Sequence, residues 1–112
     1  MADWKQAAEY NSGTVRALAK GNPEILKALR TLDAAAESKN ALDAKTRELI
    51  SLAVAATTRC EGCIAVHAAG AVKAGATRDE LLETLAVAVA LNAGAAVVYS
   101  SRILEAYDQF SG

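Results

Sequence analysis

Hydrophobic residues along the chain recur every three or four positions, which is the spacing of amphipathic helices. One such run follows Asn22 and Pro23, a pair suited to the capping position and the first turn of a helix, and it contains Ile25, Leu26, Leu29 and Leu32. No segment alternates apolar and polar residues over a useful length, as a half-buried strand would. The pattern therefore predicts an all-α fold: one domain over residues 1–112, built as a helical bundle of six or seven helices.

Capping residues and chain breakers set the predicted helix boundaries. Asp3 opens the first helix, with Gln6 answering it as in a capping box, and residues 11–13 (Asn-Ser-Gly) break the chain after it. Asp43 caps a later helix, and residues 77–80 (Thr-Arg-Asp-Glu) form another capping box. Residues 92–94 (Asn-Ala-Gly) interrupt the helix that this box opens. The predicted helices lie at about residues 4–10, 14–20, 23–37, 44–57, 78–91 and 95–110, and a further one runs from the turn at 58–61 up to residue 75.

Composition supports helices and limits what they can bury. Alanine occurs 27 times, and aromatic residues make up only 4% of the chain, so we expect a core of small aliphatic side chains. Ala-rich helices bury little apolar area each in a domain of this size. We therefore expect a homo-oligomer, whose subunit contacts cover the remaining apolar surface.

The charges and the uncharged segments restrict partners and location. Twelve Lys and Arg balance thirteen Asp and Glu without any basic run, which argues against a nucleic-acid partner. The N-terminal residues contain no apolar stretch of the signal-peptide type. The apolar run Leu85 to Tyr99 has fifteen residues, fewer than the roughly 20 that cross a bilayer, and is interpreted as a buried helix pair. We expect a cytoplasmic protein without a membrane segment.

The sharpest chemical feature is the string C-x-x-C-x-x-x-H at residues 60–67. On a helix, Cys63 and His67 lie one turn apart on the same face, so His67 can accept a proton from Cys63 or stabilise its thiolate. Cys60 lies at or before the helix start, where free backbone N–H groups and the helix dipole favour a thiolate. Two cysteines at this spacing, in a chain without an export signal, indicate redox chemistry or a metal.

Glu48 extends this string to E-x11-C-x-x-C-x-x-x-H. With this motif the sequence resembles the AhpD-like alkylhydroperoxidases, within the carboxymuconolactone decarboxylase superfamily. The likeness covers roughly Leu42 to Tyr107 and includes the segments 49–57, 68–71, 74–77 and 91–94. It implies a small AhpD-like domain, all-helical, that assembles as a trimer or hexamer.

The resemblance also implies a role for each residue of the motif. Cys63 would attack a hydroperoxide and become a sulfenic acid, and Cys60 would be the proton donor and resolving thiol that closes a Cys60–Cys63 disulfide. Glu48 and His67 would form the proton relay. The substrate would be a small hydroperoxide or a disulfide, an external dithiol would restore the pair, and no cofactor is required.

The spacing of the motif leaves one role unassigned, and one of its positions departs from the pattern of the family. Spacing alone leaves the attacking cysteine open, because in thioredoxin-like C-x-x-C sites the first cysteine usually attacks. Some members of the family carry His or Tyr just before the second cysteine, whereas this chain has Gly62 and lacks that hydrogen-bond donor or shield. Glu61 is expected to be exposed, and its negative charge opposes thiolate formation.

Other functions fit parts of the pattern. Cys60, Cys63, His67 and Glu48 offer four ligands to zinc. A cofactor-free decarboxylase of a lactone acid resembles the chain in fold, although such an enzyme does not rely on a C-x-x-C pair. In a non-catalytic assembly protein the cysteines would be small buried residues, His67 a structural residue and Glu48 a solvated one. The leading prediction is a cysteine-based thiol–disulfide oxidoreductase that reduces hydroperoxides.

Overall fold

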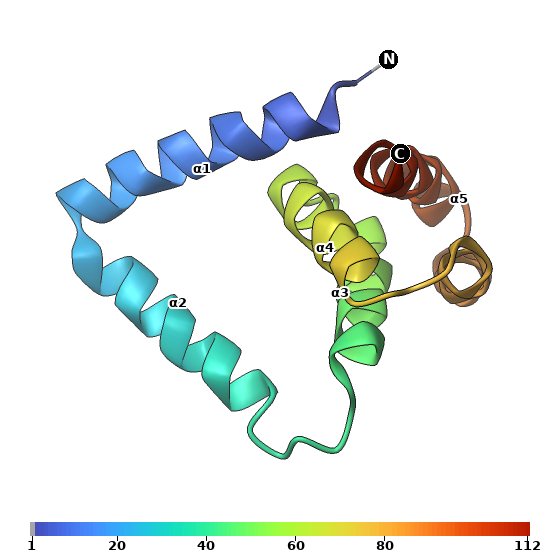
Figure 1. Ribbon diagram of the computed structural model, residues 1–112, viewed down its shortest axis with the longest axis horizontal. Coiled ribbons are helices and arrows are strands. Elements are labelled where there is room, and N and C mark those ends of the chain that lie inside the picture. Colours follow the sequence, from blue (N-terminus) through green and yellow to red (C-terminus); the bar gives the residue numbers. More distant parts are fainter. Residues whose placement is uncertain (1) are drawn as a thin grey trace.

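The computed structural model describes residues 2–112, and within them it contains five helices and no strand. Helices α1 (Trp4–Gly21) and α2 (Pro23–Ala36) form an open arm (Figure 1). Helices α3 (Ala44–Thr58), α4 (Glu61–Lys73) and α5 (Arg78–Ser111) pack against one another, whereas α2 packs against α1 and no other helix. The prediction of an all-α fold is confirmed.

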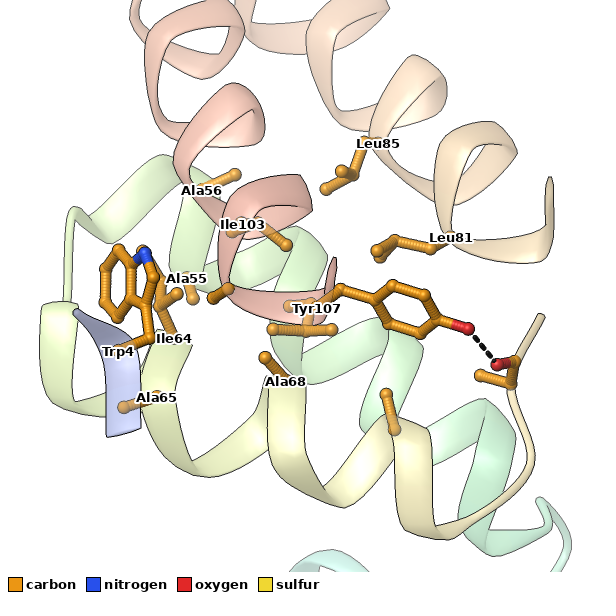
Figure 2. Close-up of a cluster of buried hydrophobic side chains, with 14 residues drawn as sticks. Trp4, Ala55, Ala56, Ile64, Ala65, Ala68, Leu81, Leu85, Ile103 and Tyr107 are labelled. Atoms are coloured by element: carbon orange, nitrogen blue, oxygen red, sulfur yellow. Dashed lines mark hydrogen bonds between the residues drawn. The ribbon is translucent and has the colours of Figure 1, made fainter. Parts of the chain in front are cut away.

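The prediction of six or seven helices is wrong: residues 2–112 contain five, and the break expected at residues 11–13 does not occur. Helix α1 runs without interruption through residues 11–13, where it lies over the start of α4. A glycine inside a helix costs only about 1 kcal/mol, which packing against a neighbouring helix can outweigh. The interruption predicted at residues 92–94 is present, because Ala93 is non-helical (φ 47°, ψ −133°). Two helical segments meet there without a loop and are counted together as α5. The second segment returns beside the first (Figure 2), so that Arg78 pairs with Asp108.

Capping fixes the helix starts much as the sequence predicts. The Asp3 carboxylate accepts the Gln6 N–H at 3.0 Å, although Gln6 returns no side-chain bond within the described residues, so only half of the first capping box forms. Helix α3 starts at Asp43, which accepts the Thr46 N–H at 2.8 Å. The second capping box, at the start of α5, is complete.

The core lies where α3, α4 and α5 meet, and it consists largely of alanine (Figure 2). Its largest fully buried side chains are those of Trp4, Leu52, Ile64, Leu81 and Ile103. Buried alanines at positions 55, 56, 65, 68 and 71 lie between them and allow α3 and α4 to approach closely. The start of α1 is held to α5, because the Trp4 indole N–H donates to the Glu105 carboxylate at 3.0 Å.

Much apolar surface stays exposed in the single chain. Helix α2 has no buried residue, and Leu29 and Leu32 on it are 49% and 66% exposed. Residues 85–99 form the predicted helix pair, which turns at Ala93, but most of them are exposed in the single chain, and Leu91 is 86% exposed. The two segments of α5 lie beside each other and pack against α3 and α4, while Val87, Val97 and Val98 on them stay exposed.

Helix α5 is also the one described helix that is long and apolar enough to cross a membrane by length and composition. Eight of its residues are nevertheless buried within the protein, among them Leu81, Leu85 and Ile103. The kink at Ala93 further divides it into two shorter helical segments. These features are those of a helix packed in a bundle.

Candidate functional site

The two cysteines lie at the start of α4 and form a disulfide, with their Cα atoms 5.2 Å apart. Arg59 ends α3 in a left-handed conformation (φ 58°), and the chain turns there directly into α4. Cys60 is the N-cap of α4, and its Sγ accepts the backbone N–H of Cys63 at 3.2 Å. Both residues are partly exposed, so the sulfur atoms lie at the surface end of the helix, where the dipole favours negative charge.

Glu48 and His67 meet across the contact between α3 and α4. The distance between Glu48 Oε2 and His67 Nδ1 is 2.8 Å, and the two side chains are 27% and 33% exposed. Because a carboxylate only accepts hydrogen bonds, the proton of neutral His67 lies on Nδ1 and leaves Nε2 free to accept another. His67 lies one helical turn after Cys63, which places these two residues on the same side of α4.

Gly70 adjoins this pair, although sequence analysis assigned it no role of its own. It lies three residues after His67, and a Cβ built on it would be only 2.6 Å from Glu48 Oε2. The signal in the sequence is a glycine in the interior of a helix, which Ala would stabilise if space allowed.

Glu61, between the cysteines, is exposed as expected, but it has a partner that the sequence did not indicate. The Arg102 guanidinium of α5 forms an ion pair with its carboxylate. The same guanidinium lies 5.1 Å from the centre of the Trp4 ring, a distance that allows a cation–π contact. Arg102 therefore offsets the negative charge that Glu61 brings to the cysteines, although both groups are partly solvated and the effect is modest.

Gly62 lies beneath α1. A Cβ at this position would be 3.8 Å from the Asn11 side-chain amide, an ordinary contact distance. The large side chain that some family members carry here would therefore meet Asn11, and the glycine leaves room for α1 to cross the start of α4.

A cavity of about 580 Å³ opens beside the acid–base pair rather than beside the sulfur atoms. Glu48, His67 and Val66 line one side, and Asp33 and Glu37 at the end of α2 line another. Neither cysteine belongs to its lining. A small molecule in this cavity would contact Glu48 and His67 but neither cysteine.

The four possible zinc ligands do not form a metal site in this oxidised state. Within residues 2–112, no group of three or more His, Cys, Asp or Glu side chains is arranged to hold a metal ion. The two sulfur atoms are bonded to each other, which leaves only the His67 ring and the Glu48 carboxylate as free donors.

Comparisons of the sequence and of the fold with known proteins lead to the same family. Residues 23–106 match the carboxymuconolactone decarboxylase family. The chain is 56% identical over 105 residues to an uncharacterized protein of Haemophilus influenzae, covering 94% of this chain and 93% of the relative. It is 32% identical over 92 residues to an uncharacterized protein of Cupriavidus necator, covering 82% and 81%. The fold superposes with a TM-score of 0.91 on the apo crystal structure of a carboxymuconolactone decarboxylase family protein from Legionella pneumophila, at 38% identity and covering 97% of both chains.

Proposed function

The chain belongs to the carboxymuconolactone decarboxylase family, and we propose that within it the protein is a thiol–disulfide oxidoreductase that reduces hydroperoxides. One observation carries the proposal. The Cys60–Cys63 disulfide lies at the start of the helix that also holds His67, and His67 is hydrogen-bonded to Glu48. A dithiol pair beside an acid–base pair is what a cysteine peroxidase needs.

In the peroxide half-reaction, the reduced Cys63 gives its proton to His67 and attacks the peroxide as a thiolate. An S–O bond forms, the O–O bond breaks, and the departing alkoxide takes the proton from the His67 imidazolium and leaves as the alcohol. Cys63 is then a sulfenic acid. The Glu48 carboxylate holds the His67 ring in place and stabilises the imidazolium while it carries the proton.

In the resolving step, the Cys60 thiolate attacks the sulfur of Cys63. The S–S bond forms and the S–O bond breaks, and the departing hydroxide takes up the proton that the Cys60 thiol released and leaves as water. One hydroperoxide and two thiols therefore yield one alcohol, one water and one disulfide. The Cys63 N–H that points at Cys60 Sγ favours the thiolate on Cys60, which suits this attack.

The cycle needs an external dithiol, because the chain has no cysteine besides these two. We place the protein in the cytoplasm, where thiol reductants are abundant. We also propose a homo-oligomer, a trimer or hexamer. The uncovered apolar face of α2 and the exposed residues Val87, Leu91 and Val97 of α5 support assembly.

A cofactor-free lyase is the second candidate function, because the acid–base pair lines the cavity while the cysteines do not. Such an enzyme would use Glu48 and His67 to move protons on a lactone acid. The two candidates differ in their need for sulfur, since Cys60→Ser and Cys63→Ser would leave a lyase active and abolish a peroxidase.

The decisive experiment is an anaerobic thiol titration of the reduced protein before and after one equivalent of hydroperoxide, with metal analysis of the same sample. The proposal expects the loss of two thiols per chain and the release of one equivalent of alcohol. The Cys63→Ser protein is the matched control and should consume no peroxide. Retention of both thiols would contradict the proposal, and stoichiometric zinc with protected thiols would favour a metal site.

A further inference from the structure

Gly70 is unlike the other helical glycines of the chain, because a functional side chain occupies the space of its missing Cβ. A Cβ on Gly70 would lie 2.6 Å from Oε2, 2.7 Å from Cδ and 2.9 Å from Oε1 of Glu48. By contrast, nothing lies within 4 Å of the corresponding point at Gly13 in α1. The whole Glu48 carboxylate therefore rests in the notch that this glycine leaves on α4.

We infer that Gly70 is a positioning residue for the proton relay: its missing side chain lets the Glu48 carboxylate lie flat against α4, where it reaches His67. His67 precedes Gly70 by three residues on the same face of that helix. The carboxylate contacts both positions at once, since Oε2 is also the atom that lies 2.8 Å from His67 Nδ1. The catalytic consequence rests on the proposed function, whereas the positioning itself does not.

An alanine at position 70 would displace the carboxylate rather than the helices. Real Cβ atoms do not approach heavy atoms below 3.0 Å, so one of the two groups must move. The carboxylate is the free end of a flexible side chain, and it borders the cavity beside His67, which gives it somewhere to go. The protein should therefore fold, but the hydrogen bond that orients the His67 ring should be lost.

The test compares Gly70→Ala with Glu48→Ala, the double variant, and Gly13→Ala as the matched control for a helical glycine with free space. His67 is the only histidine, so the ¹⁵N shifts of its ring report unambiguously which nitrogen carries the proton. The second readout is the rate at which the reduced protein reacts with iodoacetamide as a function of pH.

Gly70→Ala should lose the Nδ1–H signature and react with iodoacetamide about tenfold more slowly near neutral pH, as Glu48→Ala should. In the Glu48→Ala background, Gly70→Ala should change neither readout, because no carboxylate remains to be displaced. Gly13→Ala should leave both readouts at their wild-type values. Wild-type ring shifts and a wild-type alkylation profile in Gly70→Ala would overturn the inference.

Folding problems do not obscure the result. If Gly70→Ala fails to fold and the double variant folds, the clash with Glu48 is demonstrated directly. If the double variant also fails to fold, the space at Gly70 serves another contact and the inference is wrong. The ring shifts do not depend on peroxide turnover, so an inactive protein would count against the proposed function and not against this role of Gly70.

Discussion

Serine substitutions should distinguish the two cysteines, because these residues occupy different places on α4. Cys60 caps the helix through its bond to the Cys63 N–H, whereas Cys63 lies inside the helix, one turn before His67. Serine is a strong N-cap, so Cys60→Ser should keep the cap and Cys60→Ala should lose about 1 kcal/mol of the free energy of unfolding. For a chain of this size that loss corresponds to about 5 °C in Tm.

Both serine variants also remove the disulfide. Only two residues separate the cysteines, so the bond closes a short loop and restricts the unfolded chain little; loop-closure entropy gives about 2 kcal/mol for it. The oxidised wild-type protein should therefore melt about 10 °C above Cys60→Ser. The reduced wild-type protein should melt close to that variant, which makes it the matched comparison.

The roles of the sulfur atoms are measured by treating each variant with hydroperoxide in the presence of dimedone, followed by mass spectrometry. Cys60→Ser should trap a sulfenic acid at Cys63, because the attacking thiol and His67 remain while the resolving thiol is gone. Cys63→Ser should trap little, and both variants should lose turnover. If Cys63→Ser traps dimedone as readily as Cys60→Ser, the helix-capping thiol is the nucleophile and the assigned roles must be reversed.

Three further predictions concern the relay, the charges and the assembly. His67→Ala should slow alkylation of the reduced protein near neutral pH while lowering the free energy of unfolding by less than about 1 kcal/mol, because the ring is partly exposed; an unchanged alkylation profile with a large drop in Tm would make His67 a core residue. The hydrogen bond and charge of Lys45 lower the pKa of Glu80 below its ordinary 4.5, and hydrogen bonds from Thr46 lower the pKa of Asp43 below 3.8. A carboxyl group with a depressed pKa stabilises the fold at pH values above its ordinary pKa, so Tm should fall as the pH drops through and below this range. Glu80→Gln should weaken that fall, and a Tm independent of pH between 5 and 2 would refute the reasoning. Light scattering should give a particle several times the 11.6 kDa of one chain, reduced by Leu29→Glu on the exposed face of α2, and a wild-type particle of one-chain mass at micromolar concentration would exclude the oligomer.

The sequence by itself determined the features that depend on neighbouring residues. Side-chain caps at Asp3, Asp43 and Thr77 fix three helix starts, because each acts on backbone N–H groups within one turn. The spacing of Cys60, Cys63 and His67 placed these residues on one helical face for the same local reason. The participation of Glu48 came from the resemblance to a family, since no local rule links it to a residue nineteen positions away.

Only the tertiary structure decided the features that depend on contacts between helices. Residues 11–13 stay helical because α1 lies over Gly62, although their propensity favours a break. Arg102 reaches Glu61 because α5 packs beside the start of α4, across 41 positions of sequence. Gly70 acquires its role because α3 brings the Glu48 carboxylate into the space of its missing Cβ. Such contacts are set by the packing of side chains from distant segments, and that packing is settled only when the helices meet.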